Sequence, residues 1–262
     1  MADFTTALSG ALSRRGMKIE DFCKTSDPVE KRMIQEYGAA FLADKKVSIP
    51  SRCILSDDTS VTAFQSGLKV KTATVGGTTI KLQEAAMDDL LKAEAEIKKS
   101  TEHLTLTPRG GTTAASRTFG DTKTFWDNKV NAGINHWKGQ TKKGVKFDDE
   151  TKDLLKLPMK DQIKKVLELE DKGFFFSKNF DKTILQSVAA PGASQHLWLL
   201  ALDIEEFSNK SVRAILAKCG WFQTIKSDLP HFTYLGMEES KLSSLGLKKE
   251  TVGSQEFWVP DL

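Results

Sequence analysis

Apolar residues recur at helical spacing along much of the chain, and this pattern predicts several helices. The first 40 residues are expected to be mostly helical, and Asp27 is the predicted N-cap of a helix that runs towards Ala43. The clearest helix covers residues 82–100, where apolar side chains share one face, namely Leu82, Ala86, Leu90 and Ala93. Further helices are predicted at 121–138, at 157–171 and near 211–218.

Other segments show the alternation or the short apolar runs that are typical of strands. Residues 45–80 are expected to be strand-like, and a hairpin that turns at Gly76 and Gly77 is predicted at their end. Residues 173–185 are also expected to be strand-like, with the aromatic cluster 174–176 in the core. This mixture predicts an α+β fold, in which helices flank a small and mainly antiparallel sheet.

Two histidines and two carboxylates stand in short motifs of the C-terminal half. His196 and Asp203 lie in PGASQHLWLLALDI, and Asp228 and His231 lie in DLPHFTYLG. Two imidazoles and one carboxylate, with an open position for water, form a ligand set typical of catalytic zinc. His196, Asp203 and His231 are therefore the predicted zinc ligands. Asp228 is left over, and a carboxylate beside activated water is a candidate general base.

The chain must bend between His196 and Asp203 if both are to bind one ion. In an extended strand at ~3.3 Å per residue they would lie more than about 20 Å apart, and on a helix about 10 Å apart. Pro191 predicts a loop that carries His196, and the apolar run after it predicts a buried strand that carries Asp203. Pro230 disfavours a helix, so His231 is expected to open a second strand beside the first.

These motifs resemble those of zinc D-Ala-D-Ala peptidases of the VanX and VanY type. In that family Ser-x-His-x-x-Gly-x-Ala-x-Asp is followed by Glu-x-x-His. Ser194, His196, Ala201 and Asp203 match the first motif in type and spacing, and His231 matches the second. The resemblance covers about residues 80 to 240.

The chain departs from the family pattern at two positions. Leu199 stands where the motif has glycine, and leucine is not expected to adopt positive φ as glycine can. We therefore expect the backbone bend that glycine allows to be made differently or not to be needed. Asp228 stands where the motif has glutamate, and its side chain is one methylene shorter. Either Asp228 is too short to reach the water, or the backbone lies closer to it.

An arginine upstream completes the resemblance. Arg117, in SRTFGDTKTFW, matches the family arginine that holds the terminal carboxylate of the substrate, and Arg109 is the competing candidate. A guanidinium suits this role because it binds a carboxylate with two hydrogen bonds and stays charged. Ser194 is expected to hydrogen-bond the substrate or to shape the loop before His196.

The resemblance implies a zinc metallopeptidase that hydrolyses D-Ala-D-Ala-type bonds of peptidoglycan or its precursors, on the fold shared by hedgehog proteins and D,D-peptidases. Residues 76–262 would be the catalytic domain and residues 1–75 an N-terminal extension or accessory subdomain. Two alternatives are kept: a catalytically inactive zinc-bearing module that binds cell-wall peptides, and a metal-free structural domain. The Asp228 departure supports the first alternative, because a shortened base could leave binding without turnover.

Composition narrows the class of protein without naming its activity. At 262 residues, with 39% hydrophobic and 28% charged, the chain can bury a substantial core. No apolar run approaches the roughly 18 residues of a membrane span, so none is expected. A net charge of +3 is too small to indicate a nucleic-acid partner, although it would not repel an anionic cell-wall polymer.

The cysteines and the remaining histidines give weaker indications. Cys23, Cys53 and Cys219 contain no C-x-x-C pair, which excludes a cysteine zinc knuckle, and a Cys23 to Cys53 disulfide or three buried thiols are both compatible with the sequence. His103 and His136 have no partner at ligand spacing and are expected to be structural or incidental, as packed or surface residues.

The first 16 residues lack the apolar segment of a secretory signal peptide. Peptidoglycan lies outside the cytoplasm, so a peptidoglycan hydrolase would need to reach it. Removal of a signal, export by another route and action inside the cell on released peptides are all compatible with the sequence.

Overall fold

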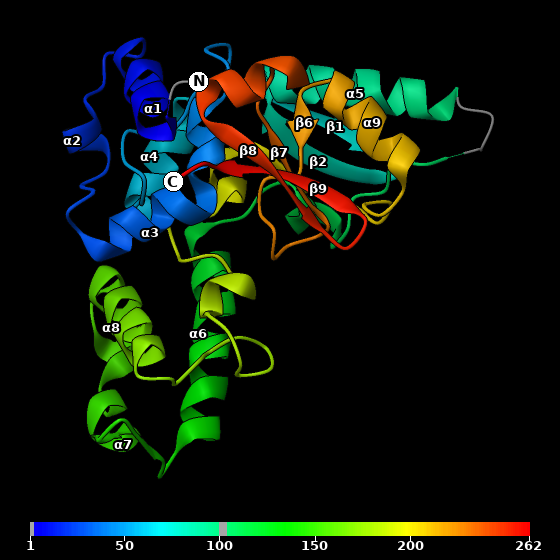
Figure 1. Ribbon diagram of the computed structural model, residues 1–262. Helices are drawn as coiled ribbons and strands as arrows, with labels where there is room; N and C mark the ends of the chain where they lie inside the picture. Colours follow the sequence, from blue (N-terminus) through cyan, green and yellow to red (C-terminus); the bar gives the residue numbers. More distant parts are fainter. Residues whose placement is uncertain (1–2, 100–103) are drawn as a thin grey trace.

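The computed structural model describes residues 3–99 and 104–262, and it shows helices around several small antiparallel sheets (Figure 1). The predicted α+β class is therefore confirmed. Buried side chains from every part of this described chain form one hydrophobic core, which extends from Phe4 near the beginning to Trp258 near the end. None of the helices in these residues combines the length and the apolar character that a membrane crossing requires.

The N-terminal region is mostly helical, as predicted, and contains α1 (Phe4–Ser13), α2 (Ile19–Phe22), α3 (Pro28–Tyr37) and α4 (Asp58–Ser66). Asp27 caps α3, because its side chain accepts hydrogen bonds from two backbone amides of the first turn. The strand-like prediction for 45–80 was wrong over α4. Asp57 and Ser60 form a capping box there, which starts a helix that the weak apolar periodicity did not reveal.

The predicted hairpin and the long helix after it are both confirmed. Strands β1 (Val70–Val75) and β2 (Thr78–Gln83) pair in antiparallel fashion around the two-glycine turn, and α5 (Glu84–Lys98) follows directly. A domain boundary at residue 75 would cut this hairpin at its turn. Residues 1–75 also bond to the C-terminal half, for example where the Leu55 amide donates to the Gly192 carbonyl at 3.0 Å.

Helices α6 (Phe119–Trp137), α7 (Phe147–Thr151) and α8 (Met159–Asp171) extend from the body of the molecule as an arm, with the short strands β3 (Thr141–Lys142) and β4 (Val145–Lys146) between α6 and α7 (Figure 1). The two helices predicted at 121–138 and 157–171 correspond to α6 and α8. A capping box between Thr118 and Asp121 places the start of α6 two residues earlier than expected.

Residues 173–185 contain no strand, so that prediction was wrong. Phe174 and Phe176 are fully buried in the core, as expected, but they pack against Phe147 of α7 rather than projecting from a sheet. The segment is held instead by Glu170 of α8, whose Oε1 accepts the backbone amides of Phe176 and Ile184. Its amides are thus satisfied by a buried carboxylate and not by a neighbouring strand.

Glu170 makes the stability of this region depend on pH. Burial raises the pKa of its carboxyl from 4.5 to about 7, although hydrogen bonds from Thr183, Ile184 and Phe176 oppose the shift. Between these values the folded protein binds more protons than the unfolded chain, so this carboxyl stabilises the protein at low pH and loses that effect as pH rises through about 7.

We expect Glu170→Gln to flatten the pH dependence of unfolding. The carboxyl should lower the free energy of unfolding of the parent by about 3 kcal/mol between about pH 4.5 and about pH 8, and the neutral amide cannot contribute this change. Urea unfolding of both proteins at the two pH values measures the difference. Equal pH dependence in the two proteins would contradict the assignment.

The C-terminal half contains the sheet that bears the candidate site. Strands β5 (Ala201–Asp203), β7 (His231–Tyr234) and β6 (Trp221–Phe222) lie in that order and are antiparallel, and α9 (Lys210–Lys218) connects β5 to β6. A second hairpin, β8 (Leu247–Val252) and β9 (Gln255–Pro260), follows. The sequence predictions did not include this hairpin, nor the short strand β6, the helix α7 or the β3–β4 hairpin of the arm.

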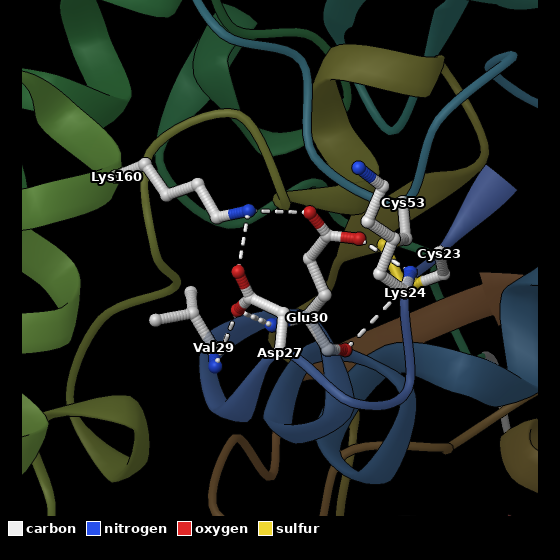
Figure 2. Close-up of a disulfide and its surroundings, with 7 residues drawn as sticks. All are labelled: Cys23, Lys24, Asp27, Val29, Glu30, Cys53 and Lys160. Atoms are coloured by element: carbon white, nitrogen blue, oxygen red, sulfur yellow. Dashed lines mark hydrogen bonds and ion pairs between the residues drawn. A yellow bond between two sulfur atoms is a disulfide. The ribbon is translucent and has the colours of Figure 1, made fainter. Parts of the chain in front are cut away.

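A disulfide and an ion-pair cluster fasten the N-terminal helices (Figure 2). Cys23 and Cys53 are joined, which decides between the two alternatives for the cysteines, and Cys219 is a half-buried free thiol. Lys160 of α8 bonds to the carboxylates of both Asp27 and Glu30, at 2.7 Å from Asp27 Oδ2. The arm is therefore tied to the start of α3.

Candidate metal centre

Three separate elements bring the predicted ligands together. His196 lies in the 3₁₀ helix η5 (Gln195–Trp198), Asp203 is the last residue of β5, and His231 is the first residue of β7. Asp203 and His231 are directly opposite each other in the antiparallel register. The strand positions agree with the sequence prediction, whereas the expected loop at His196 is a short 3₁₀ helix.

A tight turn before η5 sets the position of His196. Gly192 adopts a left-handed backbone with φ of 83°, and a Cβ atom there would lie 1.9 Å from the carbonyl oxygen of Leu55. Only glycine allows this approach, which the hydrogen bond from the Leu55 amide to Gly192 then holds. The N-terminal region thus supports the loop that leads to the first candidate ligand.

The ligand atoms of His196, Asp203 and His231 all lie within 4.8 Å of one another. Oδ1 of Asp203 is 3.4 Å from Nε2 of His196 and 3.1 Å from Nδ1 of His231. The three residues are buried, with exposed fractions of 1%, 9% and 2% for His196, Asp203 and His231. This is the spacing that a single ion between three ligands requires.

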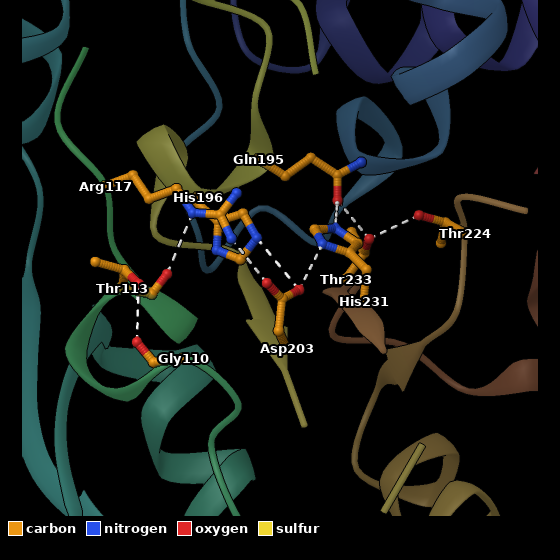
Figure 3. A network of polar contacts seen from close by, with 9 residues as sticks. All are labelled: Gly110, Thr113, Arg117, Gln195, His196, Asp203, Thr224, His231 and Thr233. Atoms are coloured by element: carbon orange, nitrogen blue, oxygen red, sulfur yellow. Dashed lines mark hydrogen bonds and ion pairs between the residues drawn. The ribbon is translucent and has the colours of Figure 1, made fainter. Parts of the chain in front are cut away.

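Hydrogen bonds around His231 indicate which of its nitrogens faces the ion (Figure 3). Oε1 of Gln195 accepts from His231 Nε2 at 2.9 Å and also from the Thr233 hydroxyl. In a neutral imidazole, Nδ1 then presents a lone pair to a carboxylate oxygen of Asp203. Two electron pairs facing each other call for a cation between them, and a metal-bound histidine usually donates its other N–H in this way.

His196 also fits a metal-binding role. Neither of its ring nitrogens makes a contact of hydrogen-bond geometry with a described residue, although the side chain is buried and Nε2 lies 3.4 Å from Asp203 Oδ1. Buried polar atoms without partners are rare, and a metal ion would engage one of the two. Burial lowers the pKa of His196 to about 4, so the imidazole is neutral, as a ligand must be.

Hydrogen bonds to both the side chain and the backbone of Asp203 fix its orientation. Nη2 of Arg117 donates to Asp203 Oδ2 at 2.8 Å, which leaves Oδ1 facing the two histidines, and the Arg109 amide donates to the Asp203 carbonyl. Burial would raise the pKa of Asp203, but its contacts with His196 and His231 hold the pKa well below the ordinary value. The carboxylate is therefore ionised and fixed in direction.

Arg117 lies in the site and Arg109 does not. Nε of Arg117 donates to the Thr113 carbonyl at 3.2 Å and Nη2 to Asp203, so Nη1 is the nitrogen left without a described partner. The Arg117 side chain lines the pocket described below. The Arg109 side chain is half-exposed and points to Glu205 and Phe207, and only its backbone supports the site.

His196 and His231 line a pocket of about 410 Å³, where the helical arm meets the body, and Asp203 lies behind them in contact with both. Ser194 is buried and lines the same pocket, and its hydroxyl does not cap the 3₁₀ helix that follows it. Helix α6 contributes the exposed ring of Phe125 and the half-buried Lys129 to the pocket lining.

Asp228 also lines this pocket, in the turn before β7. Its backbone carbonyl accepts the His231 amide at 3.1 Å, and its carboxylate receives no hydrogen bond from any described residue. The residue is exposed, yet the protein around the carboxyl withdraws it from water enough to raise its pKa, and Asp203 adds to the rise while His231 opposes it. A free carboxylate with a raised pKa suits proton transfer.

Leu199 corrects one expectation from the sequence. It adopts the left-handed conformation, with φ of 56° and ψ of 35°, although the sequence predicted that leucine would not take the positive φ that glycine allows. The side chain is buried, and the Leu199 carbonyl accepts the Gln83 amide at 3.1 Å. Burial and this hydrogen bond hold a backbone conformation that costs about 1–2 kcal/mol outside glycine.

We expect Leu199→Gly to be more stable than Leu199→Ala by about 1 kcal/mol. Both variants lose the same packing of the leucine side chain, but only glycine removes the backbone strain. Chemical denaturation of the two variants measures the difference directly. An alanine variant as stable as the glycine variant would show that the position carries no strain.

Sequence reasoning did not identify Gln195, Thr233 or Thr224, which orient His231 through a buried chain of hydrogen bonds. A glutamine between two motif residues carried no signal, because its role depends on β7 lying opposite. His136 is exposed and stacks on Phe180 with ring centroids 4.0 Å apart, and it is not part of the candidate ligand cluster. His103 lies outside the described residues.

The site thus offers three buried candidate ligands, one of which is the carboxylate that Arg117 orients, and a pocket that the free carboxylate of Asp228 and the arginine also line. This arrangement can hold a divalent cation and bring a carboxylate base and a cationic anchor to the same bound molecule. Comparison with protein-family models, with curated proteins and with solved structures finds no match to this chain.

Proposed function

We propose that the protein is a zinc-dependent peptidase that hydrolyses D-Ala-D-Ala-type bonds of peptidoglycan or its precursors. The observation that carries the proposal is the buried cluster of His196, Asp203 and His231, whose two histidines line one pocket together with Asp228 and Arg117. The finer fold assignment, to the architecture shared by hedgehog proteins and D,D-peptidases, belongs to the same proposal.

His196, Asp203 and His231 would hold the zinc, with Nδ1 of His231 and Oδ1 of Asp203 as ligand atoms. Bound zinc supplies a Lewis acid for the scissile carbonyl and lowers the pKa of water. Asp228 accepts the proton of the attacking water and passes it to the leaving amine. Gln195 and Arg117 fix the directions of the His231 and Asp203 ligands while these groups act.

Arg117 also supports a substrate that ends in a carboxylate. Its Nη1 has no described partner, its side chain lines the pocket, and a guanidinium stays ionised at any working pH. Ser194, whose hydroxyl is not used by the helix that follows, can donate to the same peptide. The motif resemblance supports D-alanine as the residue released. The position of Arg117 in the pocket supports a substrate with a terminal carboxylate.

The test is release of D-alanine from Nα-acetyl-Lys-D-Ala-D-Ala by the zinc-loaded protein. We expect release that a chelator abolishes and added zinc restores, and little release from the matched L-Ala-L-Ala peptide. Zinc binding without cleavage of either peptide would contradict the peptidase. It would favour the second candidate, a catalytically inactive zinc-bearing module. Asp228 supports this candidate because it is exposed and one methylene shorter than the motif glutamate.

A further inference from the structure

The pocket has a second polar end that the proposed reaction does not use. Tyr37, the last residue of α3, lines the pocket with only 2% of its surface exposed, and its hydroxyl has no hydrogen-bond partner among the described residues. Gln195 lines the same pocket at 1% exposure, and its amide nitrogen is likewise without a partner. Two buried donors from distant parts of the sequence thus border one cavity.

The side-chain amide of Gln195 cannot rotate to bring its nitrogen to another hydrogen-bond acceptor. His231 and Thr233 both donate to the amide oxygen, and this pair of hydrogen bonds fixes the plane of the side chain (Figure 3). The nitrogen is consequently turned away from His231. Burial raises the pKa of the Tyr37 hydroxyl, so this group also stays protonated and able to donate.

Buried donors without partners destabilise a folded protein, and they are commonly retained where a ligand completes them. Both groups here are neutral, and the pocket wall includes the apolar side chains of Val188 and Ile225. A neutral donor in such surroundings suits an uncharged acceptor better than a carboxylate. The terminal carboxylate of the peptide is assigned to Arg117 instead. A peptide carbonyl oxygen is the acceptor with these properties.

We infer that Tyr37 and Gln195 form a subsite that donates hydrogen bonds to main-chain carbonyl oxygens of the bound peptide. The inference rests on the proposed peptidase function and adds to it a neutral recognition site distinct from the arginine anchor. It also gives residues 1–75 a part in the function, because α3 supplies Tyr37 and the disulfide and Lys160 fasten the region before it. The N-terminal region then completes the substrate pocket.

The experiment compares Tyr37→Phe with Tyr234→Phe in a zinc-loaded Asp228→Asn background, in which we expect turnover to be slow enough for binding to be measured. Tyr234 is the other tyrosine of the chain, and its hydroxyl bonds to Asp89 rather than to the pocket. Calorimetric titration with Nα-acetyl-Lys-D-Ala-D-Ala should give a Kd about 3- to 10-fold higher for Tyr37→Phe and unchanged for Tyr234→Phe.

Thermal unfolding of the ligand-free variants separates a binding role from a structural one. Removing a hydroxyl that lacks a partner should leave the Tm of Tyr37→Phe equal to or above that of the parent, whereas Tyr234→Phe loses a hydrogen bond and should unfold at a lower temperature. A lowered Tm for Tyr37→Phe with unchanged peptide affinity would overturn the subsite.

Gln195→Glu tests the second donor. The substituted side chain keeps an oxygen for His231 and Thr233 but replaces the NH₂ group by an acceptor, so peptide affinity should fall about 10-fold or more while one zinc ion stays bound. Unchanged affinity would overturn the role of Gln195. If the peptide binds the Asp228→Asn protein and all further variants with equal affinity, the subsite is refuted and the peptidase function is not. If the peptide does not bind the Asp228→Asn protein at all, the peptidase function is refuted together with the subsite.

Discussion

Replacing Asp228 with asparagine is expected to lower kcat for peptide hydrolysis by about 10²- to 10⁴-fold and to leave zinc bound. Asp228 lines the pocket beside the candidate ligands, and its carboxylate accepts no hydrogen bond from a described residue. The amide has nearly the same shape but cannot take a proton from water. Steady-state kinetics with the D-Ala-D-Ala peptide, together with zinc content, measure both parts of the prediction.

Two further variants sharpen this result. Asp228→Glu restores the longer carboxylate of the family motif and should retain far more activity than the asparagine variant. Ser227→Ala changes the neighbouring pocket residue without removing a carboxylate, and it should keep kcat within about 10-fold of the parent. Hydrolysis by Asp228→Asn at the parental rate would show that another group is the base.

Replacing Arg117 with alanine is expected to lower kcat/KM on the order of 10²-fold. The variant loses the hydrogen bond to Asp203 Oδ2 and a guanidinium that lines the pocket and has Nη1 without a described partner, so both ligand orientation and carboxylate binding suffer. Arg117→Lys keeps the positive charge but cannot span both partners, and its kcat/KM should lie between the parent and the alanine variant.

Arg109→Ala is the matched control for this prediction. Its side chain is half-exposed and lies over Phe207, and its link to the site is a backbone hydrogen bond that alanine retains. Kinetics of the control should match those of the parent. A larger loss for Arg109→Ala than for Arg117→Ala would reverse the assignment of the carboxylate anchor.

The sequence was sufficient to predict the central geometry because the constraints there are local. Pro191 and Gly192 indicated the turn before His196, and Pro230 indicated that His231 opens a strand. Neighbouring antiparallel strands then bring Asp203 and His231 opposite each other, as the register shows. The helices with clear apolar periodicity, α5, α6 and α8, were predicted for the same reason.

Residues whose role depends on distant neighbours could not be predicted in this way. Tyr37 belongs to the pocket only because α3 packs against the C-terminal half, and Gln195 acts through β7. Leu199 holds a left-handed backbone because tertiary packing outweighs its local preference. The segment 173–185 has a strand-like composition, but Glu170 satisfies its amides from α8.

Elemental analysis of the purified protein, after zinc has been supplied, tests the central claim most directly. We predict one equivalent of zinc in the parent and in His136→Ala, whose histidine stacks on Phe180 away from the site, and a clear loss in His196→Ala. A parent that binds no zinc, or a His196→Ala variant that binds as much as the parent, would contradict the metal centre.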